Sequence, residues 1–301
     1  MEKANWLIIS GKAELKESTI KYIPLIQKNK LGIDENTPSF VSSNIEFEAG
    51  EISFKVILKD KFGLCQVILG TDTGSDLNVG INTSGKLFGI TKFDRQSNKW
   101  EIVSGSASAE NLEIGKEYNI RISVNGSIVK LFVDEIQVAY CIHEIRQTQL
   151  QIVFSSVGEI IVKDFRVKKI KPKAFVVMQF TEEYNELYNE VIKPVCEDYG
   201  IECERADDYH TTNMIIEDIV ASIISASVVI AEITPDNPNV FYEVGYSHAI
   251  NKPTILLCEK KKTKLPFDLS SFRTLFYDNT IAGKTQVEKK LRKYLQTIFK
   301  K

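Results

Sequence analysis

The sequence is poor in the residues that build disulfide frameworks and metal centres. It has five cysteines, an odd number, and three histidines in 301 residues. A disulfide-stapled secreted protein carries an even set of cysteines, and a structural zinc site needs Cys or His pairs a few residues apart. We therefore expect reduced thiols, no metal and no bound cofactor. The cysteines are Cys65, Cys141, Cys196, Cys203 and Cys258.

Long apolar runs and an excess of charge are also missing. The formal net charge is -2 and the isoelectric point is near 6.1. No run approaches the roughly 20 apolar residues of a membrane-spanning helix, and residues 1–10 have too short an apolar core for a signal peptide. We therefore predict a cytoplasmic protein that binds neither a membrane nor nucleic acid.

Glycine-rich phosphate-binding loops are absent as well. Neither the Walker pattern nor the Rossmann fingerprint occurs, which argues against kinases and dehydrogenases. With 43% hydrophobic and 26% charged residues, the composition is that of an ordinary globular protein. The length favours two domains.

The first half of the chain has the pattern of a β-sandwich. From residue 40 to 168, short runs with alternating polarity are separated by turn residues, and no helical period intervenes. Asn125-Gly126 joins two runs and is the strongest hairpin signal, because both residues tolerate positive φ. The predicted strands include 52–58, 65–69, 118–124 and 128–133, with Trp6–Ile9 as a candidate opening strand.

This half resembles the concanavalin-like and laminin-G-like jelly rolls. The resemblance lies in the hairpin Ile122–Asp134 and the closing strand Gly158–Val167. It implies a domain for sensing, binding or assembly, with a small molecule or a glycan as its ligand. Three acids, Asp72, Asp76 and Asp94, fit either a calcium or glycan site or ordinary turns. Because Asp is a favoured turn residue, we expect turns.

The second half alternates strands and helices. A charged, proline-bearing segment at 169–173 separates a sandwich domain, 1–168, from this domain, 174–301. Alternating βα units predict a doubly wound parallel sheet of the flavodoxin-like kind. The predicted strands are 174–178, 201–205, 226–231 and 253–257; the helices are 182–199 with a kink at Pro194, 213–225, 239–251 and one from about 285.

One acid, Glu243, draws attention in this domain. Its helix follows a polar loop at the carboxyl end of a strand, where open parallel sheets bind ligands. With Asn239 as N-cap, Glu243 falls in the first turn, where the helix dipole keeps a carboxylate ionised, and Gly245 leaves room beside it. An ionised carboxylate suits attack on a glycosidic carbon, because it stabilises or captures an oxocarbenium ion. The alternative is that Glu243 only completes a helix start.

The motifs of this domain are similar to those of bacterial TIR-like proteins related to nucleoside 2-deoxyribosyltransferases. They occur in the same order and cover nearly the whole domain. The matching segments are Phe175–Phe180, Glu204–Asp207, Ile219–Ala226, Val229–Thr234 and Asn237–Ala249.

The resemblance implies that Glu243 is the catalytic glutamate of N-glycosidic cleavage. Substrate contacts are implied for the strand tips and the loop. Tyr246, three residues after the acid, is a further candidate contact on the same helix face, and a core role fits it at least as well. Glu232 stands where the family usually has Asp, and a longer acid at this position would lose or shift a ribose contact. The implied substrate contacts are Gln179 and Phe180 under the base, Arg205 on a phosphate, and Asp207, Glu232, Asn237 and Asn239 on ribose or phosphate.

Three functions remain open at this point. The first is cleavage of NAD or a related nucleotide as an antiviral defence effector that is active on self-association, with NAD as substrate rather than cofactor. We favour it, because nicotinamide leaves NAD as a neutral group and needs no general acid. The others are deoxyribosyl transfer or hydrolysis, and nucleotide sensing without catalysis.

The remaining polar residues fit structural roles better. His248 lies about 140° around the helix from Glu243 and therefore faces elsewhere. Tyr242 precedes the acid and is as consistent with the core as with a site. The charged run 259–264 predicts a solvated loop whose lysines could attract a phosphate.

Overall fold

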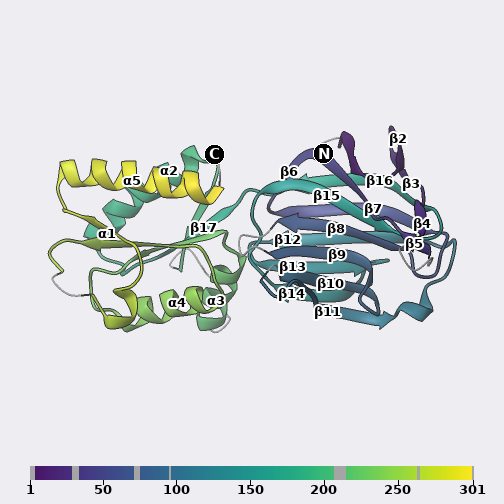
Figure 1. Cartoon of the computed structure of the whole chain (residues 1–301). Helices are drawn as coiled ribbons and strands as arrows, with labels where there is room; N and C mark the ends of the chain where they lie inside the picture. Colours follow the sequence, from purple (N-terminus) through teal and green to yellow (C-terminus); the bar gives the residue numbers. More distant parts are fainter. Residues whose placement is uncertain are drawn as a thin grey trace. The chain divides into compact units, whose positions relative to one another are not determined.

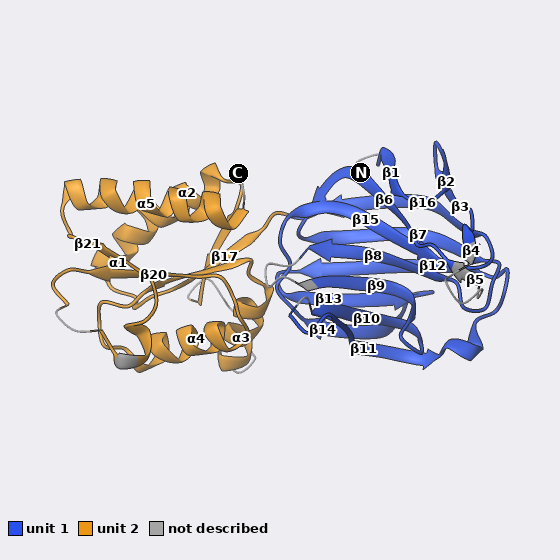
Figure 2. Ribbon diagram, viewed as in Figure 1, with its two compact units in different colours: residues 1–170 blue, residues 171–301 orange. Residues whose placement is uncertain are grey.

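The chain divides into two compact units, residues 1–170 and 171–301, in a computed structural model (Figures 1 and 2). The structure describes residues 4–28, 34–70, 75–94, 96–206, 215–262 and 265–299. The division falls inside the segment 169–173 that the sequence predicts as a linker. Each unit has its own hydrophobic core.

The N-terminal unit is a sandwich of two seven-stranded antiparallel sheets. One sheet has the order β1 (Trp6–Ser10), β6 (Ser39–Phe47), β15 (Thr148–Ser155), β8 (Leu64–Gly70), β9 (Ser75–Thr83), β10 (Lys86–Asp94) and β11 (Lys99–Ser108). The other has the order β14 (Ile136–Ile142), β13 (Ile128–Val133), β12 (Glu117–Asn125), β7 (Gly50–Leu58), β16 (Ile160–Lys169), β3 (Thr19–Tyr22) and β2 (Ala13–Lys16). A separate pair is formed by β4 (Ile26–Lys28) and β5 (Asp34–Asn36), and a short helix by η1 (Ala109–Asn111).

The alternation of side chains explains this sandwich. Along β7, Ile52, Phe54 and Val56 are buried between the sheets and the residues between them are half-buried. A strand places successive side chains on opposite faces, so an alternating sequence builds one apolar face. The predicted sandwich and opening strand are confirmed. The predicted hairpin is confirmed too: Asn125 pairs with Ile128, with a positive φ at Gly126.

The C-terminal unit is built on a five-stranded parallel sheet. Counted along the chain, its strands have the order 2-1-3-4-5, as in flavodoxin-like doubly wound sheets. The prediction of a parallel sheet with flanking helices is confirmed, although the strand at 274–277 was not predicted. The strands are, in sheet order, β18 (Glu202–Arg205), β17 (Lys173–Val177), β19 (Val228–Glu232), β20 (Thr254–Glu259) and β21 (Thr274–Tyr277).

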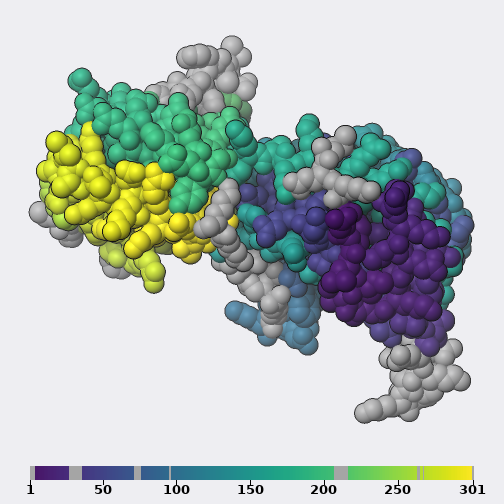
Figure 3. All heavy atoms as spheres, turned by 90° about the horizontal axis from the view of Figure 1, so that it is seen from above, coloured from purple at the N-terminus to yellow at the C-terminus, as the bar shows by residue number. Residues whose placement is uncertain are grey.

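Helices cover both faces of this sheet (Figure 1). One face carries α1 (Glu182–Leu187), the π-helical η2 (Tyr188–Ile192), α2 (Lys193–Asp198) and α5 (Ile281–Phe299). The other carries α3 (Ile215–Ser225) and α4 (Pro238–Ala249), and η4 (Phe267–Leu269) follows β20. Figure 3 shows α5 beside the segment α1 to α2 on the surface of the first face. The π-helical turn interrupts the predicted helix 182–199 next to Pro194, the second residue of α2.

Side chains of β19 alternate between the two faces. Ile230 belongs to the core under α1, α2 and α5, whereas Val229 and Ala231 belong to the core under α3 and α4. Glu232, the next residue, therefore points toward the α5 side. None of the helices in the described part of the chain has the length and apolar character needed to cross a membrane.

Candidate functional site

A pocket of about 610 Å³ lies between the first two turns of α3 and the first two turns of α4. These helices follow β18 and β19, so their N-terminal ends lie at the carboxyl edge of the sheet, where such folds bind ligands. The walls are mostly apolar, with one acid and one amide. The lining residues are Ile216 and Ile219 of α3 and Pro238, Asn239, Tyr242 and Glu243 of α4.

The start of α4 differs from the prediction. The N-cap is Asn237, whose side chain accepts a hydrogen bond from the backbone N–H of Asn239 at 3.0 Å. Pro238 is the first helical residue, a position that suits proline because its fixed φ fits and no N–H is needed there. Glu243 consequently lies in the second turn, and its placement in the first turn was wrong. The dipole acts mainly within the first turn, so it contributes less at Glu243 than predicted.

Burial raises the pKa of Glu243 to about 7. This is the opposite of the predicted effect, because the loss of solvent around a half-buried carboxylate disfavours its charge. Within the described residues, the carboxylate has no hydrogen bond or ion pair. Gly245 is exposed, and a Cβ there would meet no atom within 4 Å, so packing does not require glycine at this position.

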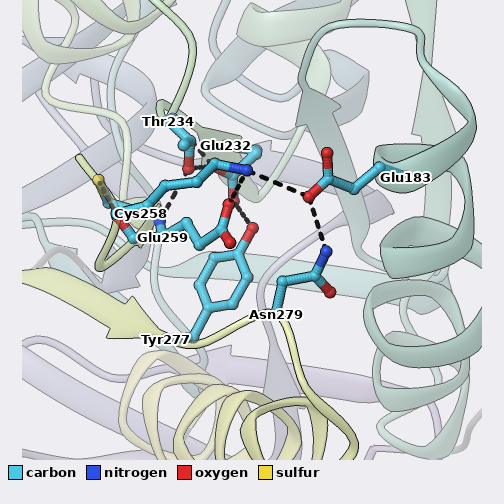
Figure 4. Close-up of polar contacts among 8 residues, drawn as sticks. Glu183, Glu232, Thr234, Cys258, Glu259, Tyr277 and Asn279 are labelled. Carbon is cyan, nitrogen blue, oxygen red and sulfur yellow. Dashed lines mark hydrogen bonds and ion pairs between the residues drawn. The ribbon is translucent and has the colours of Figure 1, made fainter.

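Glu232 lies on the opposite side of the sheet and is fully buried. One carboxylate oxygen accepts hydrogen bonds from the backbone N–H of Thr234, at 2.9 Å, and from its hydroxyl; the other accepts from the Tyr277 hydroxyl at 2.9 Å (Figure 4). Burial nevertheless raises the pKa of Glu232 to about 7. The structure does not place this predicted ribose contact among the residues that line the pocket.

A polar network extends from Glu232 across the carboxyl edge (Figure 4). Thr234 Oγ1 accepts a hydrogen bond from the backbone N–H of Glu259 at 2.8 Å, and Lys261 forms ion pairs with Glu259 and, at 3.3 Å, with Glu183. Asn279 Nδ2 donates to Glu183 at 2.7 Å. Hydrogen bonds and ion pairs thus connect three strands and α1 at this edge.

Arg205, the predicted phosphate contact, packs toward α1 and η2. It is only 7% exposed, and its Nη1 donates to Asn185 Oδ1 at 2.8 Å. The guanidinium lies 4.3 Å from the ring centre of Tyr188 and 5.3 Å from that of Phe180. Phe180 is exposed and Gln179 half-buried, and neither lines the pocket.

The other predicted contacts divide between pocket, cap and core. Asn239 lines the pocket, Asn237 caps the helix, and Tyr246 packs partly against the core under α3 and α4. Asp207 lies outside the described residues. His248 stacks on Phe272 with ring centres 3.9 Å apart, and burial lowers its pKa. The packing interpretation of His248 is confirmed.

Sequence reasoning named Asn239 and Glu243 but missed the pocket walls formed by Ile216 and Ile219, and it left Tyr242 open between core and site. Tyr242 and Ile216 are 54% and 42% exposed, respectively, which is high for large side chains next to a partly buried acid. Only the docking of α3 against α4 brings these side chains to one opening.

The sandwich unit holds the three acids that the sequence analysis weighed as turn residues or as a binding site. Asp94 accepts hydrogen bonds from Gln96 N at 2.9 Å and Ser97 Oγ at 2.7 Å, as a turn acid does. Asp76 lies within β9, so the turn expected there was wrong, and Asp72 lies outside the described residues. A groove of about 590 Å³ crosses β12, β7 and β16, and its Arg121 forms an ion pair with Glu135 at 2.8 Å. In the part of the chain that the structure describes, no Cys, His, Asp and Glu side chains gather to hold a metal.

Comparison with known proteins identifies no family. No family model matches the chain, and no curated protein matches it. Solved structures match at low similarity. The carbohydrate-binding module CBM66 from Bacillus subtilis is 11% identical with a TM-score of 0.42, over 55% of this chain and 95% of that one. A protein of unknown function with a galectin-like fold from Bacillus subtilis is 11% identical with a TM-score of 0.39, over 55% and 89%.

A third match is LamAcat from Zobellia galactanivorans. It is 12% identical with a TM-score of 0.37, over 52% of this chain and 80% of that chain. With TM-scores below 0.5 in all three cases, no functional conclusion rests on these likenesses. The β-sandwich is established by its own strand order and pairing.

Proposed function

We propose that the C-terminal unit hydrolyses the N-glycosidic bond of NAD or a related nucleotide, with Glu243 as the catalytic carboxylate. The observation that carries this proposal is an acid without a described partner in a mostly apolar pocket at the carboxyl edge of a parallel sheet. An acid with such a perturbed pKa is typical of catalytic sites, because burying an unpaired carboxylate lowers the stability of the fold. The resemblance to TIR-like proteins supports the same reaction and a role in antiviral defence.

The chemistry follows from the charges of the reactants. The bond between ribose C1 and the nicotinamide nitrogen breaks, and the electron pair leaves with the ring, which becomes neutral. Ionised Glu243 stabilises the positive charge that develops on the ribose, and water then adds to C1 and releases a proton. The products are nicotinamide and the ribosylated remainder of the nucleotide.

The pKa of Glu243 favours a substrate that carries positive charge. Near neutral pH the free acid is only partly ionised, because burial raises its pKa to about 7. A cationic ring that enters the pocket lowers this pKa and supplies the missing counter-charge. A neutral nucleoside brings no such charge and needs a proton on its base. Glu243 cannot supply that proton and remain the ionised stabiliser.

The test measures nicotinamide released from NAD by the full-length chain over a range of protein concentrations, since activity is expected on self-association. We expect Glu243→Gln to lower the rate by about 10²- to 10³-fold. Glu217→Gln, which alters an exposed acid in the first turn of α3, is the matched control and should retain activity. In wild type, kcat/KM should rise as pH increases through 7, because the ionised form of Glu243 is the active one.

Two results would replace the proposal. Release or exchange of bases from deoxynucleosides, with NAD untouched, would assign the pocket to deoxyribosyl chemistry. Binding of a nucleotide without turnover in either protein would assign it to sensing.

A further inference from the structure

Lys262 lies beneath the loop that joins β19 to α4. Its side chain is 8% exposed. The ammonium donates to the carbonyl oxygen of Ile233 at 2.8 Å and to Asp236 Oδ1 at 2.9 Å, and lies 5.3 Å from the ring centre of Phe241. A lysine ammonium has three N–H groups and no acceptor. It therefore contacts the start of the loop, the middle of the loop and the first turn of the helix at once.

The neighbouring lysines behave differently. Lys260 forms an ion pair with Asp278 at 2.5 Å and is 52% exposed, and Lys261 is 56% exposed. These two fit the solvated loop that the sequence predicts, and for Lys262 that prediction was wrong. Three lysines in succession thus differ in what they contact, and one of them is directed inward.

The loop above Lys262 determines where α4 begins. Its first residues are also bonded to β20, by Ile233 N to the Leu257 carbonyl at 2.9 Å and by Glu259 N to Thr234 Oγ1 at 2.8 Å. Lys262 adds the only contact among these that reaches α4 itself, through Phe241. Phe241 is two residues from Glu243, so a shift of this turn moves the carboxylate.

We propose that Lys262 is a positioning residue, which holds the loop and the first turn of α4 so that the Glu243 carboxylate stays in its half-buried pocket. The catalytic consequence rests on the proposed function, whereas the positioning itself does not. An ammonium suits this task because it binds a carbonyl, a carboxylate and an aromatic face together.

The experiment replaces Lys262 with Met, which keeps a long apolar side chain and removes the ammonium. Lys260→Met is the matched control. The Glu243 carboxyl is titrated by NMR in protein labelled with ¹³C-glutamate, with its signal assigned from Glu243→Gln. We expect Lys262→Met to move the pKa of Glu243 from about 7 toward the ordinary value, because a loosened turn admits water. Lys260→Met should leave it unchanged.

The direction of the shift separates movement from charge. Loss of a nearby positive charge would by itself raise the pKa of a carboxyl group, so a fall in the pKa indicates that the helix has moved. For NAD cleavage we expect kcat to fall at least about tenfold, with a smaller change in KM, because misplaced catalytic groups lose rate.

A wild-type titration and a wild-type kcat in Lys262→Met would overturn the proposal, whatever its thermal stability. If that variant does not fold, Phe241→Leu removes the aromatic contact of the ammonium without changing any charge, and it should lower the pKa of Glu243 by a smaller amount. Absence of that shift would equally overturn the proposal. If the wild type cleaves no NAD, the proposed function fails, while the titration still decides the role of Lys262.

Discussion

Two glutamates at the carboxyl edge of the parallel sheet share a raised pKa and differ in everything around it. Burial brings both Glu232 and Glu243 to about 7. Glu232 accepts hydrogen bonds from Thr234 and Tyr277, whereas Glu243 has no partner among the described residues. Burial of a carboxylate is costly unless hydrogen bonds offset it. The hydrogen bonds of Glu232 therefore indicate a structural role, whereas the buried charge of Glu243 without a described partner makes it the candidate for a functional role.

The comparison is sharpest in stability. We expect Glu232→Ala to lower the free energy of unfolding by about 3 kcal/mol, because the buried donors of Thr234 and Tyr277 lose their acceptor. Glu243→Ala should cost less than about 1 kcal/mol or stabilise the protein, since no described donor depends on it. Urea denaturation measures both. Equal losses in the two variants would remove the distinction between the acids.

The pH dependence of stability tests the unsatisfied charge. The folded pKa of Glu243 is about 7, above the ordinary 4.5, so the folded state loses stability as pH rises through this range. Glu243→Gln cannot ionise at this position and avoids that loss. Allowing for partial exposure, we expect the free energy of unfolding of this variant to exceed that of wild type by about 1 to 2 kcal/mol at pH 8 and to match it at pH 4. Thermal unfolding at both values, with Glu217→Gln as control, measures it, and a pH-independent difference would contradict it.

A smaller effect is expected from one hydroxyl. Tyr277→Phe keeps the ring and removes the donor to Glu232, so the free energy of unfolding should fall by about 1 to 2 kcal/mol. The pKa of Glu232 should rise further, because the lost hydrogen bond favours its ionised form. Tyr140→Phe, at an exposed position of β14, is the control for urea denaturation. If both variants unfold alike, the bond to Glu232 contributes no stability.

The smallest effect concerns the pocket wall. Tyr242→Ala should raise KM for NAD about fivefold, since an aromatic contact contributes about 1 kcal/mol, and Tyr242→Phe should resemble wild type. The value of kcat should change little, because in the proposed function Tyr242 contacts the substrate ring and does not stabilise the developing charge. Steady-state kinetics of nicotinamide release measures KM and kcat separately. A large loss of kcat in Tyr242→Phe would mean that the hydroxyl takes part in the reaction.

Part of the site could be predicted from local patterns. Asn237-Pro238 is the signal that marks the true start of α4, because proline is favoured at the first helical residue directly after an N-cap. The prediction of Asn239 as N-cap overlooked this signal and placed Glu243 two residues too close to the N-terminal end of the helix. The strand Thr274–Tyr277 could also have been predicted from β-propensity, because it contains a β-branched residue and two aromatic residues.

Sequence periodicity by itself determined the two architectures. A period of two builds the sandwich, and alternating strand and helix patterns build the parallel sheet, because each period puts apolar side chains on one face. Only the tertiary structure decided which acid has partners and which lysine points inward. Glu232 meets Tyr277, and Lys262 meets Ile233 and Asp236, across long stretches of chain. Such contacts depend on how strands and helices pack, and no local pattern records them.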